Sequence, residues 1–181
     1  NDMYAQRLDA SGAVQWAAGG LPVANVGATS ESSGVVIPDG ADGIIAAYVI
    51  GGDVRAQRLN GSGAKQWTAT GVVISAAANN QNDPLIVTDG AGGAIISWED
   101  ARNGGGNQDL FAQRVNSAGA VQWAADGLAI TAAVNDQDRM TSAVPDGSGG
   151  VVVAWEDSRA GASGVYAQRL NSSGTQVWTA N

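Results

Sequence analysis

The sequence predicts an all-β repeat protein, and three observations support that prediction. A phrase built around Ala-Gln-Arg occurs four times, and each copy is followed by a polar turn with a glycine and then by a tryptophan. The alanines of the phrase, at positions 5, 56, 112 and 167, are 51, 56 and 55 residues apart. Each period also contains short apolar runs separated by Asp-Gly turn signals, which are typical of antiparallel strands.

The composition fits thin sheets and excludes several functional classes. The chain has 181 residues, 44% of them hydrophobic and 26 of them glycine, which suits one domain with closely packed strands. The net charge is −8 and Lys65 is the single lysine, so the basic stripe of a nucleic-acid binder or an anionic-membrane binder is missing. There is no histidine and no cysteine. No apolar run approaches the ~18 residues of a membrane span.

Two strands open each full period. We expect the first at 34–37, 85–87 and 141–144, where each run leads into a glycine-rich Asp-Gly turn. The second is expected at 44–48, 94–98 and 151–155. These second runs are nearly continuous in apolar residues, which predicts burial on both faces.

Two further strands complete the period. The third strand is the Ala-Gln-Arg phrase, and we expect the fourth to contain the tryptophan at position 16, 67, 123 or 178. A linker then returns to the next period, and it is rich in Asn, Asp and Gln at 79–83 and 135–138. Four antiparallel strands in about 50 residues is the pattern of a β-propeller blade.

The predicted fold is therefore a β-propeller with about 3.5 four-stranded blades in this chain. The predicted units are a half-blade at 1–27 and blades at 28–78, 79–134 and 135–181, together one propeller domain or segment. Fourteen strands in all are expected. Propeller rings usually contain ~4–8 blades, so we expect either a partial propeller within a longer chain or subunits that complete one another.

The hairpin of the third and fourth strands resembles the tryptophan-docking hairpin of quinoprotein-type propellers. Tyr166-Ala167, Gly174 and Trp178 occupy the corresponding places. The match departs from that family because an arginine stands where the family has Leu or Asp, and because the turn is one residue longer. The period is also similar to repeats of large secreted bacterial proteins. The resemblance implies a fold and an extracellular or cell-surface location, and it names no activity.

The repeated arginines and tryptophans are predicted to be structural. A buried arginine needs a carboxylate, and the Asp-Gly turns and the Trp-Glu-Asp-x-Arg motif supply them, which predicts a polar clasp between strands or blades. A tryptophan that recurs once per period suits blade-to-blade packing. A ring of arginines around an anionic ligand is the alternative. The residues are Arg7, Arg58, Arg114, Arg169, Trp16, Trp67, Trp123 and Trp178.

Candidate ligand-binding residues follow the second strand in two periods. Packing in the core is the default interpretation of the two tryptophans, and the alternative is an exposed aromatic face that, flanked by carboxylates and arginine, would suit a sugar ring. The loop after this strand and the Asx-rich linker should meet on one rim. The candidates are Trp98, Glu99, Asp100 and Arg102, and then Trp155, Glu156, Asp157 and Arg159.

Calcium is the one cofactor the sequence suggests. Ca²⁺ takes six to eight oxygen ligands, and Asn82, Asp83, Asp136 and Asp138 supply oxygens on the same rim. The alternative is that these residues cap turns, because the spacing matches no EF-hand loop.

These observations favour a non-catalytic extracellular structural or interaction module, with no activity as an enzyme. Its expected partners are copies of itself or further repeats of a longer chain. No nucleic-acid binding and no membrane insertion are expected. The alternative function is a lectin-like module that binds carbohydrate, with or without Ca²⁺.

Overall fold

The computed structural model describes residues 2–24, 27, 29–104, 108–131, 137, 140–157 and 164–179. Within these residues the chain is all-β and has no helix. Its strands form four antiparallel sheets that follow one another in sequence order.

The strands of each sheet are neighbours in the sequence. The first sheet is β1 (Tyr4–Ala5) and β2 (Leu21–Pro22). The second sheet is β3 (Glu31–Pro38), β4 (Ile44–Ile50), β5 (Asp53–Leu59) and β6 (Val72–Ser75). The third sheet is β7 (Gln81–Thr88), β8 (Ala94–Asp100), β9 (Asp109–Val115) and β10 (Leu128–Thr131). The fourth sheet is β11 (Met140–Pro145), β12 (Val151–Asp157) and β13 (Gly164–Leu170).

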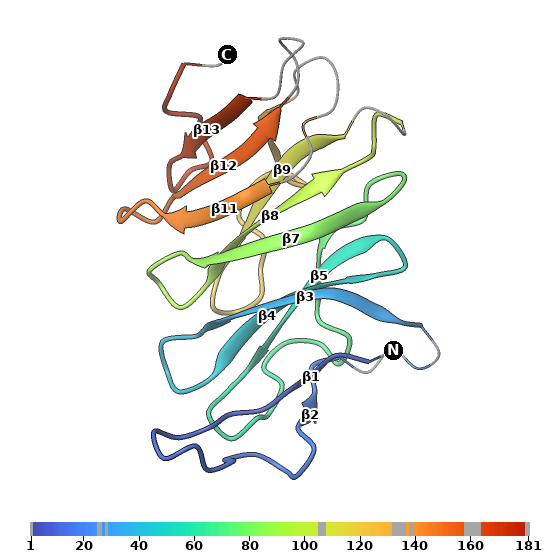
Figure 1. The fold of residues 1–181 in the computed structure, drawn as a ribbon, viewed down its shortest axis with the longest axis vertical. Helices are drawn as coiled ribbons and strands as arrows, with labels where there is room; N and C mark the ends of the chain where they lie inside the picture. The colour runs from blue at the N-terminus through green and yellow to red at the C-terminus, as the bar shows by residue number, and fades with distance from the viewer. Residues whose placement is uncertain are drawn as a thin grey trace.

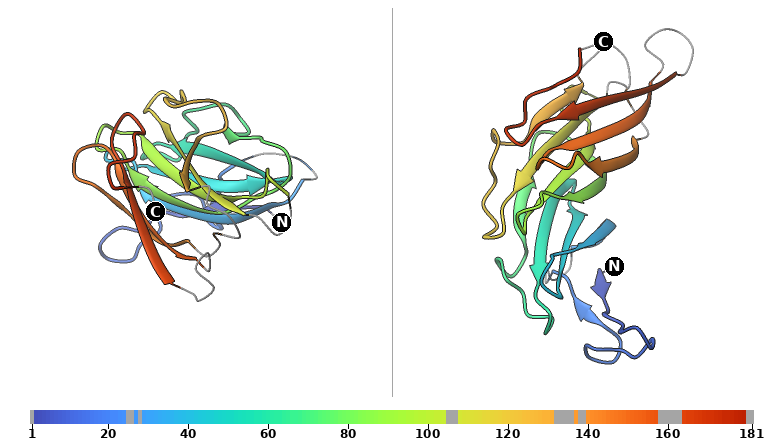
Figure 2. Two further views of the ribbon diagram at one scale, coloured as in Figure 1. Left: turned by 90° about the horizontal axis from the view of Figure 1, so that it is seen from above. Right: turned by 90° about the vertical axis from the view of Figure 1, so that its left-hand side faces the viewer.

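The sheets are stacked face to face, as Figure 1 and Figure 2 show, and the opening strands β3, β7 and β11 lie side by side along the stack. Hydrophobic clusters fill the spaces between consecutive sheets. One joins Ile45 and Val54 of the second sheet to Ile96 and Trp98 of the third. Another joins the third sheet to the fourth, and a third lies between the first and second. Each sheet therefore depends on its neighbours for a core, as in other repeat proteins.

In the second, third and fourth sheets the second strand is the most buried, because it has a neighbouring strand on both edges and a packed sheet against it. All seven residues of β8 are buried, including the polar Ser97, Glu99 and Asp100. The prediction of burial on both faces is thus confirmed for β8, and β4 follows the same pattern. In β12 buried and half-buried residues alternate.

The fourth strand differs from the expected one. It begins five residues after the tryptophan, at Val72 after Trp67 and at Leu128 after Trp123. The prediction that the fourth strand contains the tryptophan is therefore wrong for these two copies. The chain leaves the sheet after the turn so that the indole can reach the next sheet. Gly71, at φ 74°, then returns the chain to the sheet edge.

The number of strands and the extent of one linker also differ from those predicted. The described residues contain thirteen strands rather than fourteen, and the fourth sheet has three. The stretch 79–83, expected as a linker, provides the start of β7 from Gln81 onward. β7 accommodates this polar start through a register shift between Asn82 and Leu85, where Asp83 has φ 46°.

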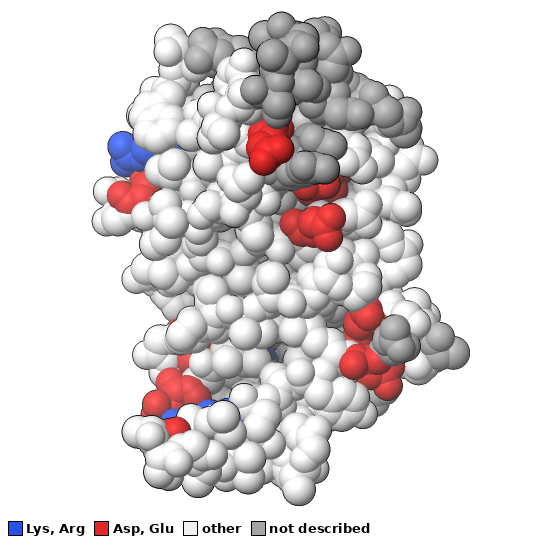
Figure 3. All heavy atoms as spheres, viewed as in Figure 1, with Lys and Arg blue, Asp and Glu red and all other residues white. Residues whose placement is uncertain are grey.

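The surface is dominated by uncharged groups. Figure 3 shows acidic groups on both flanks of the face it presents, with basic groups beside some of them. Of the residues that the structure describes, none belongs to a helix long and apolar enough to cross a membrane.

Candidate functional site

The turn between the first two strands of a sheet binds the arginine of its third strand. Asp39 accepts N–H groups from Ala41 and Gly43 through Oδ1, at 2.8 and 2.7 Å, which closes the turn. Its Oδ2 accepts Nε of Arg58 at 2.9 Å. Asp89 with Arg114 and Asp146 with Arg169 repeat this arrangement in the third and fourth sheets. The buried carboxylate therefore serves the turn and the arginine together.

These contacts keep two of the aspartates ionised. Burial opposes ionisation of Asp39, but the Ala41 N–H, Arg58 and the Gly43 N–H together outweigh it and lower the pKa below 3.8. Asp146 behaves in the same way, since the N–H groups of Ser148 and Gly150 and the guanidinium of Arg169 overcome its burial and lower its pKa.

The other end of each arginine reaches the following sheet. Arg58 Nη1 and Trp67 Nε1 both donate to the carbonyl oxygen of Ser117, at 3.3 and 3.2 Å. Arg114 and Trp123 both donate to the carbonyl of Ser172, at 3.2 and 3.3 Å. We call this arrangement the sheet joint: one arginine and one tryptophan of a sheet that share one turn carbonyl of the next sheet.

The first and second sheets have the same joint, but the ion pair that holds its arginine is more exposed. Arg7 and Trp16 donate to the carbonyl of Gly61 at 3.2 and 3.0 Å. The described part of the first sheet contains no Asp-Gly turn of its own, so Arg7 pairs instead with Asp42 at 3.3 Å. Both side chains of that pair are exposed, at 37% and 80%.

A glycine in the accepting turn makes room for the indole. A Cβ on Gly119 would lie 2.8 Å from Cδ1 of Trp67. Gly63 and Gly174 also face Trp16 and Trp123, at 3.5 and 3.1 Å, but there the nearest side-chain atom belongs to Leu21 or Leu128. All three have φ of 83–84°, a left-handed conformation that favours glycine. The glycine of the repeated phrase is therefore both a turn residue and the surface on which the preceding tryptophan rests.

The glutamine of the phrase holds the tryptophan segment against its own sheet. The side-chain oxygen of Gln57 accepts the backbone N–H of Trp67 at 3.1 Å, and its amide nitrogen donates to the carbonyl of Thr68 at 2.6 Å. Gln113 makes the same two contacts with the Trp123 segment. Sequence reasoning assigned this glutamine no role, although its repetition ten residues before every tryptophan was a usable signal.

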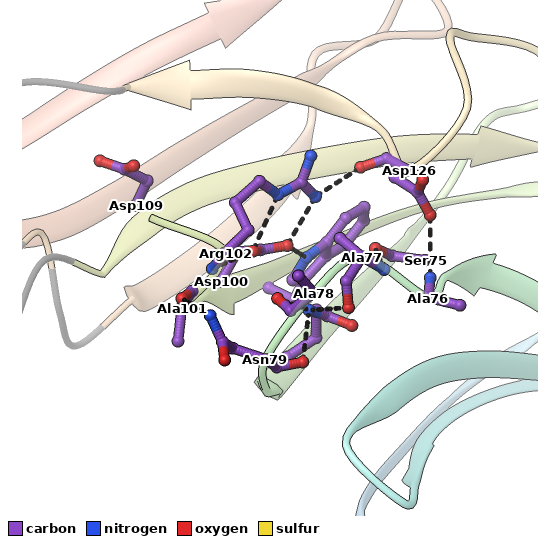
Figure 4. Close-up of polar contacts among 12 residues, drawn as sticks. Ser75, Ala76, Ala77, Ala78, Asn79, Asp100, Ala101, Arg102, Asp109 and Asp126 are labelled. Atoms are coloured by element: carbon purple, nitrogen blue, oxygen red, sulfur yellow. Dashed lines mark hydrogen bonds and ion pairs between the residues drawn. The ribbon is translucent and has the colours of Figure 1, made fainter. Parts of the chain in front are cut away.

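The end of β8 forms a second cluster, drawn in Figure 4. Asp100 accepts Nε1 of Trp98 at 2.8 Å and two nitrogens of Arg102 at 2.8 and 2.6 Å. Arg102 lies over the ring of Phe111 at 3.7 Å and donates to the carbonyl of Asp126 at 2.7 Å. Trp98, Asp100 and Arg102 of the Trp-Glu-Asp-x-Arg motif therefore contact one another and the β9–β10 connection, whereas Glu99 accepts the backbone N–H of Met140 at 3.2 Å.

This cluster also bridges two sheets. The carboxylate of Asp126, in the third sheet, accepts the backbone N–H of Ala76, which follows β6 of the second sheet, at 2.9 Å. Sequence reasoning missed Asp126, although it stands in an Asp-Gly pair, and its φ of 57° fits a turn.

The predicted sugar platforms lack an exposed aromatic face. The Trp98 side chain is fully buried and Trp155 is 3% exposed. Trp98 packs against Phe111 and Trp155 against Tyr166, and Trp155 Nε1 donates to Asp157 at 3.2 Å. Both rings therefore pack in the core, in agreement with the default interpretation and not with the alternative of exposed platforms, because the strand that carries each tryptophan lies inside its sheet. Glu156 is half-buried, and Arg159 lies outside the described residues.

The predicted calcium ligands are only partly visible. Asn82 and Asp83 belong to β7, and Ser33 donates its hydroxyl to the Asp83 carboxylate at 3.2 Å. Asp136 and Asp138 lie outside the described residues. Within the part of the chain that the structure describes, no group of three or more acidic, histidine or cysteine side chains could hold a metal ion. A calcium site on this rim stays a prediction.

The linker and the loop after the second strand do meet. The backbone N–H of Ala101 donates to the carbonyl of Asn80 at 2.9 Å, and Gln81 N–H reaches the carbonyl of Gly52 in the preceding sheet at 2.7 Å.

Comparison with protein-family models, with curated proteins and with solved structures found no match to this chain. The role of the sheet joint and of the β8 cluster therefore rests on their geometry.

Proposed function

We propose that this chain is a non-catalytic structural and interaction module, a segment of a β-propeller that works through the joining of one sheet to the next. Its location would be extracellular or at a cell surface. Its partners would be copies of itself or further repeats of a longer chain. The single observation that carries the proposal is the sheet joint, which recurs between each pair of consecutive sheets.

The joint has a direction, and that supports assembly. Every sheet from the first to the third donates from its arginine and tryptophan and every sheet from the second to the fourth accepts on a turn carbonyl. A directional contact of this kind can be extended by any further unit that carries the same two halves, which is the basis of repeat assemblies and of heterologous oligomers.

Sedimentation velocity tests the proposal on the 181-residue chain. We expect a concentration-dependent increase from monomer to dimer or larger species over the micromolar range. A compact, stably folded monomer at every concentration would contradict a role in self-assembly.

The lectin-like alternative has lost its main structural argument, because its two aromatic platforms are buried. It keeps a direct test. A glycan array probed with and without a chelator would show sugar binding, and loss of binding with chelator would identify calcium as its cofactor.

A further inference from the structure

We propose that a second copy of this chain docks head to tail, with Arg169 and Trp178 of one copy donating to the backbone carbonyl of Ala10 in the other. This inference rests on the proposed role in assembly and assigns the surfaces that perform it. The fourth sheet carries the donor half of a sheet joint, and the first sheet carries the acceptor half. A contact between these two surfaces would be the same joint that the chain makes within itself.

The donor half is already positioned on the fourth sheet. Arg169 is held by Asp146 through Nε at 2.9 Å, the geometry that Arg58 has with Asp39. Arg58 then reaches the next sheet through Nη1, whereas Nη1 of Arg169 has no hydrogen-bond partner among the described residues. The guanidinium therefore keeps a donor group without a partner among the described residues.

The indole of the donor half is also free. Trp178 Nε1 has no acceptor among the described residues, and the residue is 45% exposed, whereas in the complete joints Trp16 is 8% exposed and Trp67 and Trp123 are half-buried. Gln168 accepts the backbone N–H of Trp178 at 3.1 Å, so the segment is tied to its sheet as in the other copies. An exposed indole held in this way is a preformed docking group.

The acceptor half is preformed on the first sheet. Asp9 accepts the N–H groups of Ser11 and Ala13 at 2.9 and 3.0 Å. Asn60 holds the accepting turn of the second sheet with the same pattern, at 3.1 Å to Ser62 and 2.9 Å to Ala64. The turn shape that presents the Gly61 carbonyl to Arg7 and Trp16 is therefore reproduced around Ala10.

The place for the indole is open. Gly12 has φ 83°, as Gly63 does, but a Cβ added to Gly12 would meet no atom within 4 Å, whereas one on Gly63 would meet Trp16 and Leu21. The surface that receives a tryptophan in each internal joint is thus exposed here. A second copy is the occupant that the geometry favours, because it carries the matching arginine, tryptophan and spacing by construction.

The contact is heterologous, since the two surfaces differ. Its repetition produces a closed ring where the rotation closes and an open filament where it does not. Each copy uses one donor end and one acceptor end, so a copy with a single damaged end can still join one neighbour.

Two single variants and their mixture test the inference in sedimentation velocity. Trp178→Ala removes the indole of the donor end. Gly12→Asn fills the acceptor end with a side chain that tolerates left-handed backbone. Gly90→Asn is the matched control, because Gly90 has φ 73° and also meets no atom within 4 Å, but it lies in the third sheet away from both ends. Circular dichroism and urea unfolding check that each variant is folded.

We expect Trp178→Ala and Gly12→Asn each to weaken association at least tenfold, and Gly90→Asn to associate like the original chain. An equimolar mixture of the first two should form heterodimers and nothing larger, because each supplies the end that the other lacks. Assembly of both variants at the original affinity would overturn this joint and leave the proposed self-assembly intact. A monomeric original chain would overturn both.

Discussion

Replacing Gly119 with alanine tests whether the indole of Trp67 rests on the turn of the next sheet. The change adds one methyl group at a position whose φ is 84°. That methyl would lie 2.8 Å from Cδ1 and 2.9 Å from Cγ of Trp67, closer than nonbonded carbon atoms approach. The indole must move, and its hydrogen bond to the carbonyl of Ser117, 3.2 Å long, must lengthen or break.

The expected cost has two parts. Left-handed backbone costs a residue with a Cβ about 1–2 kcal/mol, and any open left-handed glycine would show that part alone. Displacing Trp67 adds about 1–3 kcal/mol for overpacking. Losing the indole hydrogen bond adds about 0.5–1.5 kcal/mol. Gly119→Ala should therefore lower the free energy of unfolding by about 1.5–4.5 kcal/mol more than a backbone control does.

Gly90→Ala is that control, since Gly90 lies in the same sheet at φ 73° with no atom near its missing Cβ. Urea unfolding at pH 7, followed by tryptophan fluorescence and far-ultraviolet circular dichroism, measures both variants. Equal destabilisation of the two would refute the argument, because the tryptophan would then contribute nothing at this turn.

Three further outcomes follow from the same contacts. Arg114→Gln should cost about 2–3 kcal/mol in urea unfolding, because it strands the Asp89 side chain, which is 1% exposed; the cost stays below that of a fully buried pair since the guanidinium is 22% exposed. Arg7→Gln removes an exposed ion pair and should lower the free energy of unfolding by less than about 1 kcal/mol. Equal losses of stability in Arg7→Gln and Arg114→Gln would contradict the role given to burial. Folding lowers the pKa of Asp39, so the stability that its carboxylate contributes is complete above about pH 4 and is lost as the pH falls through the folded-state pKa. The urea midpoint should therefore fall between pH 5 and pH 2, and it should fall less in Asp39→Asn. Asp100→Asn should lower stability by about 1.5–3 kcal/mol in thermal unfolding, because a neutral amide loses the charge-assisted bonds to its indole and guanidinium donors, and an unchanged melting temperature would show that this cluster is not structural.

The joint shows why residue roles were harder to predict than strands. Periodicity identified Arg58, Arg114 and Arg169 as members of one class, and the Asp-Gly turns as sources of carboxylate. It did not show that one guanidinium serves two sheets, because the second acceptor is a backbone carbonyl. Every residue has such a carbonyl, so no side-chain pattern marks the one that is used.

The burial of the tryptophans was equally hard to predict from the sequence. Trp98 and Trp67 are the same residue type, and the sequence predicts a strand position for both. One is fully buried inside its sheet, whereas the other leaves its sheet to rest on the next. Exposure depends on which strand has neighbours on both sides, and that depends on the stacking of sheets rather than on local residues.

The sequence by itself determined the all-β class, the repeat length, the hairpin turns and the burial of the second strands β4 and β8. These features follow from local chemistry: glycine and aspartate set the turns, and the two-residue period and apolar runs set the strands. Only the tertiary structure decided where the fourth strand begins, which carbonyl each arginine and tryptophan bind, and which joint halves remain open on the first and fourth sheets. The joint contacts link residues that are 45 to 59 positions apart, and these partners become neighbours only after the sheets have stacked.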